Sequence, residues 1–154
     1  MLWLESALDG RSGASMLTER PRGSGSRRDS RGTPSFDELL KEVDRARRAG
    51  DNDLAAATLR KMINLYPGNG RIVSALFTLG KVESQRGRYV DAARAYRRCW
   101  RSSPRGTLAE DAHFQEAISW DRIGRIREAQ AAARRYLQAF PTGPYAERMR
   151  RIAQ

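Results

Sequence analysis

The sequence predicts an all-α solenoid of helical hairpins, with three repeats and a C-terminal capping helix. Two residue types recur every 37 residues and mark the repeat. They are Gly50, Gly87 and Gly124, and Pro67, Pro104 and Pro141. A stretch with helical patterning lies between each glycine and its proline, so each unit consists of a helix, a glycine turn, a helix and a proline stop. Single units of this kind cannot bury their own apolar faces and must stack on their neighbours.

The chain divides into a linker and a repeat domain. Gly, Ser and Arg dominate residues 10–34, which show no apolar period. Such a composition buries too little apolar surface to offset the entropy lost on ordering, so we expect residues 1–34 to be a disordered segment. We expect the repeat domain to span residues 35–154. Its predicted parts are repeats at about 35–70, 71–106 and 107–141, and a cap at 142–154.

The first repeat has a clear beginning and end. Ser35 and Glu38 have the spacing of a capping box, and Pro34 stops the helix from extending backwards. The helix then carries an apolar stripe, and Gly50 ends it as a left-handed cap. The stripe consists of Leu39, Leu40, Val43 and Ala46. A second helix follows over about 54–66, where Pro67 closes it.

The later repeats follow the same plan. The second repeat predicts helices at about 72–86 and 89–101. In the third, Thr107 and Glu110 have the spacing of another capping box, and helices are expected to 123 and over 126–140. A last short helix places Tyr145, Met149 and Ile152 on one side, which suits a lid over the end of the array. We therefore expect seven helices.

The middle unit resembles the tetratricopeptide repeat family. The matching positions are Leu76, Leu79, Gly80, Gly87, Tyr89, Ala92, Tyr96 and Pro104. The resemblance implies a right-handed superhelix that binds proteins and is not an enzyme. Two departures stand out: the unit is longer than the family's usual length of about 34 residues, and Glu83 occupies a position that is normally aromatic.

The closing phrase at 136–146 is similar to the long repeats of bacterial envelope proteins. These include envelope assembly proteins and the C-terminal repeats of membrane-anchored anti-sigma regulators. That resemblance implies a role in envelope assembly or sigma-factor regulation. The chain as written shows no export signal or anchor, because Glu5 and Asp9 interrupt the apolar start. We expect it to be cytoplasmic as written, and periplasmic or membrane-associated if the N-terminus is incomplete.

The inventory of reactive side chains predicts no enzyme, no cofactor and no metal site. Cys99 is the only cysteine and His113 the only histidine, and the sequence has no glycine-rich phosphate loop. Cys99 stands in register with Met62 and Tyr136, which favours a buried apolar role. His113 and Trp100 also fall at packing positions. We expect both to be structural.

The first helices of the three units predict a binding groove for a protein or peptide partner. The 37-residue step aligns Leu40 with Phe77 and Phe114, and one turn later it aligns Asp44 with Lys81 and Ile118. Three apolar side chains in a row could anchor an extended or helical peptide. The alternative is that the two phenylalanines only fill the space between neighbouring first helices.

The second helices carry a repeated pair of cations, which we call the basic ladder. It consists of Arg60, Lys61, Arg97, Arg98, Arg134 and Arg135. With a net charge of +11, the chain should attract nucleic acid, acidic lipid or an acidic protein, and the ladder is a candidate polyanion site. Two simpler explanations stay open: a solvated outer face, and an arginine bias from a GC-rich genome, since 26 of the 29 cations are arginine.

Overall fold

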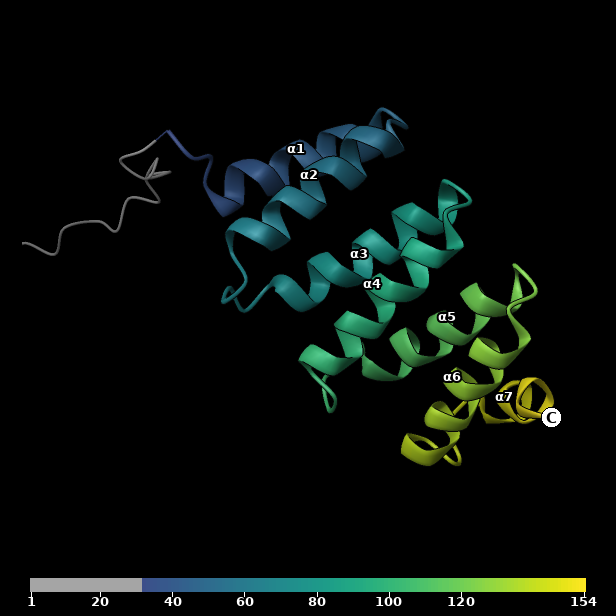
Figure 1. Ribbon diagram of the computed structural model, residues 1–154. Helices are drawn as coiled ribbons and strands as arrows, with labels where there is room; N and C mark the ends of the chain where they lie inside the picture. The colour runs from purple at the N-terminus through teal and green to yellow at the C-terminus, as the bar shows by residue number, and fades with distance from the viewer. Residues whose placement is uncertain (1–31) are drawn as a thin grey trace, which may run out of the picture.

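The computed structural model describes residues 32–154, and the predicted linker therefore lies outside the described residues except for 32–34. The described part holds seven helices and no strand, arranged as successive antiparallel hairpins (Figure 1). The helices are α1 (Phe36–Arg48), α2 (Asn52–Leu65), α3 (Ile72–Gln85), α4 (Tyr89–Ser102), α5 (Ala109–Asp121), α6 (Ile126–Ala139) and α7 (Ala146–Ala153). The predicted all-α helical-hairpin solenoid is confirmed.

The predicted glycine turns are also confirmed. Gly50, Gly87 and Gly124 each follow the first helix of a hairpin, with φ of 73°, 71° and 67°. This left-handed backbone region strains side chains but not glycine, which explains why the residue recurs at the same step.

One of the two predicted capping boxes is present. The Ser35 hydroxyl accepts from the Glu38 N–H, and the Glu38 carboxylate accepts from the Ser35 N–H at 2.8 Å. The box predicted at Thr107 is wrong, because α5 starts one residue later, with Leu108 as its N-cap and no side-chain cap. The Gly106 carbonyl accepts the Ala109 N–H at 3.0 Å, so a backbone turn satisfies one N–H at the start of α5.

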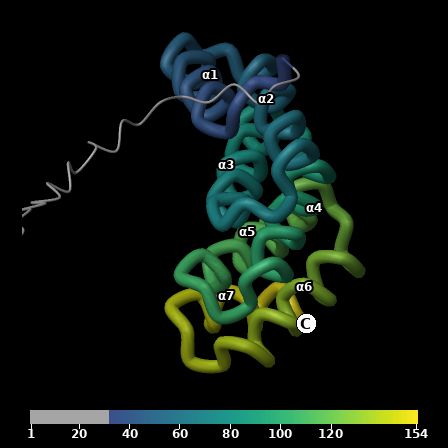
Figure 2. Tube along the Cα trace, turned by 90° about the vertical axis from the view of Figure 1, so that its left-hand side faces the viewer, coloured from purple at the N-terminus to yellow at the C-terminus, as the bar shows by residue number. Residues whose placement is uncertain are grey.

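The hairpins stack in chain order and α7 closes the array (Figure 2). Each helix packs on the helix before it and the helix after it, and α7 packs on both α6 and α5. One buried cluster fills α1 to α4 and reaches Ala112, and a second fills α5 to α7. Met149 of α7 is fully buried, as expected of a helix that covers the end of a stack.

Small residues let the helices of a hairpin approach closely. A Cβ added to Gly80 of α3 would lie 2.6 Å from the Tyr96 ring of α4, closer than any real contact. Gly80 therefore marks a close crossing of α3 and α4. Cys99 is fully buried nearby and donates to the Val73 carbonyl at 3.4 Å, and burial raises the pKa of its thiol to about 11. It fills space, as predicted.

Candidate functional site

An apolar cavity of about 140 Å³ lies on the face formed by the first helices, between α1 and α3. Its inner wall is made by apolar side chains of α1, α2 and α3, with charged groups at the edge. The wall includes Phe36, Leu40, Val43, Leu59, Met62 and Ala75, and the charged groups are Asp44, Arg47 and Arg71. The cavity can hold an apolar group while its edge pairs with charges of either sign.

The edge is partly fixed by contacts within the protein. Arg71 lies over the Phe36 ring, 4.4 Å from its centroid, and its guanidinium donates to Asp37 at 2.6 Å. The Phe36 ring in turn packs edge-on against Tyr66, whose hydroxyl donates to the Pro34 carbonyl at 2.7 Å. These contacts join the start of α1 to Tyr66, just after α2, and to Arg71, just before α3.

A second hollow of about 200 Å³ lies between α3 and α5 and is lined mainly by residues with polar side chains. Its lining residues are Ser84, Gln85, Tyr89, Gln115, Ile118, Ser119 and Arg122. Amide and hydroxyl groups of this kind can bond to the main chain of an extended peptide. The face of the first helices thus has one apolar and one polar recess.

The six predicted groove residues differ in their surroundings. Leu40 and Asp44 line the apolar cavity, and Ile118 lines the polar hollow. Phe77 is half-buried with its ring edge-on to Tyr96, and Lys81 is exposed on α3. Phe114 is covered, because the Tyr145 ring stacks on it with centroids 3.9 Å apart. Sequence reasoning did not find that the ring of Tyr145, just before α7, covers Phe114, which was the third predicted anchor.

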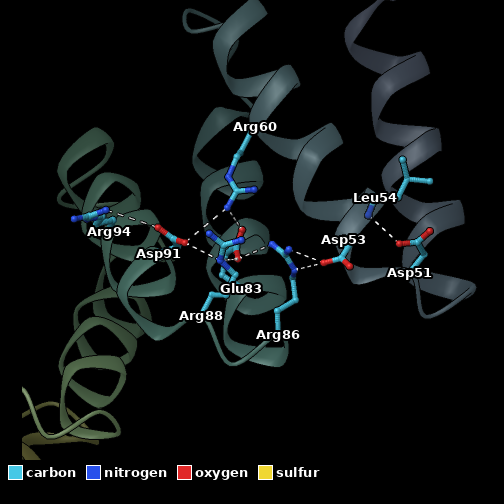
Figure 3. Close-up of polar contacts among 9 residues, drawn as sticks. All are labelled: Asp51, Asp53, Leu54, Arg60, Glu83, Arg86, Arg88, Asp91 and Arg94. Carbon is cyan, nitrogen blue, oxygen red and sulfur yellow. Dashed lines mark hydrogen bonds and ion pairs between the residues drawn. The ribbon is translucent and has the colours of Figure 1, made fainter.

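A buried carboxylate lies at the junction of the first two hairpins (Figure 3). The Glu83 side chain is fully buried, and it accepts from Arg60 of α2 and, at 2.9 Å, from Arg86 at the end of α3. The Arg88 Nε lies 3.8 Å from the Glu83 Oε2. Glu83 takes the place of the aromatic residue expected there, and the surrounding guanidinium groups explain how a charge is tolerated in the interior.

The arginines around Glu83 have further acidic partners. Arg86 donates to Asp53 of α2 at 2.7 Å, and Arg88 donates to Asp91 of α4 at 3.0 Å. Burial lowers the pKa of Arg86, but its hydrogen bond to Asp53 and the charges of Glu83 and Asp53 raise that pKa above its ordinary value overall. The network joins α2, α3 and α4 in one set of ion pairs.

A different buried carboxylate lies at the junction of the second and third hairpins. Glu116 of α5 accepts from the Trp100 indole N–H and from Arg135, each at 2.8 Å. The Trp100 ring stacks on His113 with centroids 4.0 Å apart, as expected of a packing tryptophan and a structural histidine. Burial, together with the nearby charge of Arg135, lowers the pKa of His113 to about 4, and its Nδ1 has no hydrogen-bond partner.

The basic ladder is not a uniform row of uncommitted charges. Arg60 is bound to Glu83, Arg135 is bound to Glu116, and Arg134 donates to the Ala153 carbonyl at 3.2 Å. Lys61, Arg97 and Arg98 are exposed. Half of the ladder therefore contributes to the fold, and the sequence step alone could not separate the two halves.

The comparisons with known proteins agree with this architecture. Residues 35–69 match the family model of the tetratricopeptide repeat, a span that covers α1, α2 and the turn after them. The match falls on the first hairpin, although the second carries more of the quoted motif positions. No curated protein matches the chain. Tetratricopeptide repeats generally mediate protein–protein interaction and typically serve as scaffolds without enzymatic activity.

No helix within residues 32–154 combines the length and apolar character needed to cross a membrane.

Proposed function

We propose that this protein is a non-enzymatic interaction module that binds an extended segment of a partner protein along its first helices. The observation that supports this best is the apolar cavity between α1 and α3, because a recess lined by Leu40 and Ala75 and edged by charges suits one apolar side chain of a peptide. The similarity of the closing phrase to bacterial envelope repeats supports a partner from envelope assembly or sigma-factor regulation.

The polar hollow adds hydrogen-bonding groups to the apolar contact made in the cavity. Burying one large apolar side chain stabilises a complex by about 1.5–3 kcal/mol, whereas association costs at least about 4 kcal/mol. Hydrogen bonds from Gln85 and Gln115 in the polar hollow to the peptide main chain would offset the difference. Phe77 and Lys81 lie on α3 between the residues that line the two recesses, so one segment could cross both.

Selection from a random peptide library tests this proposal. A phage-displayed library would be panned against the immobilised full chain, and each enriched peptide would then be measured against two variants. Ser74→Trp places an indole at the mouth of the cavity from an exposed position, whereas Ala57→Trp places the same group on the exposed side of α2. We expect peptides with one large apolar residue, whose binding is lost with Ser74→Trp and kept with Ala57→Trp. Peptides that bind both variants equally would contradict the proposed site.

A further inference from the structure

The uncommitted positive charge of the outer helices is concentrated on α4. Along α4, Arg97 and Arg98 lie three and four residues after Arg94, and Arg101 lies three residues after Arg98. This spacing places the four arginines on one side of the helix, and all four are exposed. Arg105, in the turn after α4, is also exposed. We call these five residues the arginine stripe. Within residues 32–154 its one ion pair joins Arg94 to Asp91, at 3.8 Å.

A hollow of about 210 Å³ adjoins the arginine stripe between α2 and α4. Arg94 and Arg98 of the stripe line it, together with Arg60 and Asn64 of α2. Figure 3 shows Arg60 reaching from α2 towards Glu83, with Asp91 and Arg94 beside it on α4. Arg60 is bound to Glu83 and Arg94 lies 3.8 Å from Asp91, so within residues 32–154 Arg98 is the arginine of the hollow that has no ion pair and is left for an added anion.

The guanidinium groups of this surface suit carboxylates as well as phosphates. Guanidinium groups bind both, often through two parallel hydrogen bonds. Asp91 and Glu83 also lie in the wall of the hollow and weaken its attraction for any anion, whereas Arg97 and Arg101 of the stripe are exposed outside it. None of the exposed large apolar residues of the described chain is aromatic, so the stripe lacks the exposed rings on which bases stack, and this favours an acidic protein segment over nucleic acid.

We propose that the arginine stripe and the adjoining hollow bind an acidic protein segment whose Asp or Glu residues recur about one helical turn apart. Side chains spaced three or four residues along a partner helix lie about 5–6 Å apart at their Cβ atoms, which matches the spacing of the arginines on α4. One partner carboxylate pairs with Arg98 at the hollow, and the others pair with Arg97 and Arg101. This surface lies on the second helices, away from the cavity of the proposed function, so the two proposals stand or fall separately.

The test uses a fluorescein-labelled polyglutamate peptide as the probe and the full chain as the protein. The stripe variant carries Arg97→Gln, Arg98→Gln and Arg101→Gln. The control carries Lys41→Gln, Arg45→Gln and Arg48→Gln, which remove the same charge from exposed positions of α1. At about 50 mM salt we expect the stripe variant to lose at least about tenfold in affinity and the control less than about threefold, with binding weakened at about 300 mM salt. Thermal unfolding of each variant checks the fold.

Three outcomes would overturn the proposal. Equal losses in both variants would mean that the probe responds only to net charge. Absence of peptide binding to the folded chain at low salt would show that the stripe does not bind an acidic segment. A labelled DNA duplex that binds more tightly than the peptide, and through the same three arginines, would assign the stripe to a phosphate backbone instead.

Discussion

The two junctions between neighbouring hairpins each bury a glutamate, but they hold it differently. Glu83 lies among three arginines, and each of them has another acidic neighbour: Asp53 for Arg86, and Asp91 for Arg60 and Arg88. Glu116 is held by Arg135 and Trp100, for which the described chain shows no other carboxylate partner, and the Arg135 Nε is buried without a hydrogen bond. The first junction is a redundant network, whereas the second depends on one carboxylate.

The largest expected effect comes from removing the carboxylate of the second junction. Glu116→Ala leaves the Trp100 N–H and the Arg135 guanidinium without their acceptor, so we expect a loss of about 3–5 kcal/mol in unfolding free energy. The same truncation at the first junction, Glu83→Ala, leaves arginines that still have Asp53 and Asp91, and should cost about 1–3 kcal/mol. Urea unfolding of both variants measures the difference.

The two truncations are matched, since each removes the same side chain from a fully buried site on a first helix. The cavity term is therefore similar and the partners make the difference. A cost for Glu83→Ala that equals or exceeds that of Glu116→Ala would show that the extra acidic partners do not compensate, and the contrast between the junctions would fail.

The second junction should also make stability depend on pH. His113 has a pKa of about 4 in the folded protein and about 6.5 when exposed, so the unfolded chain binds the proton more tightly. The contribution of neutral His113 is full above pH 6.5 and is lost as the pH falls towards 4, by on the order of 3 kcal/mol. His113→Leu introduces the residue found at the equivalent positions 39 and 76 of the other units, and it should remove this dependence.

The measurement for His113 is the difference in unfolding free energy between the native chain and His113→Leu across that pH range. Glu116 and Arg135 are common to both proteins, so their own titration cancels to first order. We expect the unfolding free energy of His113→Leu to rise relative to that of the native chain as the pH is lowered from 6.5 to 4. A constant difference would mean that the histidine takes up its proton in the folded state without cost.

Much of this fold could be predicted because the residues that begin and end its helices act locally. Gly50, Gly87 and Gly124 need only their own backbone conformation to end a helix, and Ser35 needs only Glu38 three residues on. The error at Thr107 arose because α5 begins one residue later than the capping box requires, with Leu108 as its N-cap. Local signals of this kind do not depend on how the hairpins stack.

The candidate sites were harder to predict because they depend on packing between units. Arg60 and Glu83 are 23 residues apart and meet only when α2 lies against α3. Tyr145 covers Phe114 from 31 positions away, and no 37-residue step links that pair. One signal was present: Glu83 broke the family pattern at a position expected to be apolar, and such a departure indicates a charge that must find partners inside.

The same comparison can be carried into the interior of the hairpins. The position of Gly80 is occupied by Val43 in the first unit, and that of Tyr96 by Leu59. Compared with the first unit, the second has a smaller residue on its first helix and a larger one on its second helix. All four residues are buried. The hairpins thus reach a similar close packing by two different combinations.

The smallest expected effect tests this exchange of volume. Gly80→Val adds a side chain where a Cβ would already lie 2.6 Å from the Tyr96 ring, and we expect it to cost about 1–3 kcal/mol. Adding Tyr96→Leu recreates the pair of the first unit and should recover part of that loss, because the ring that blocks the valine is gone. The measured quantity is the coupling energy from the two single variants and the double variant by urea unfolding. Simple additivity of the two losses would show that residues 80 and 96 do not share the space, since independent sites add and contacting ones do not.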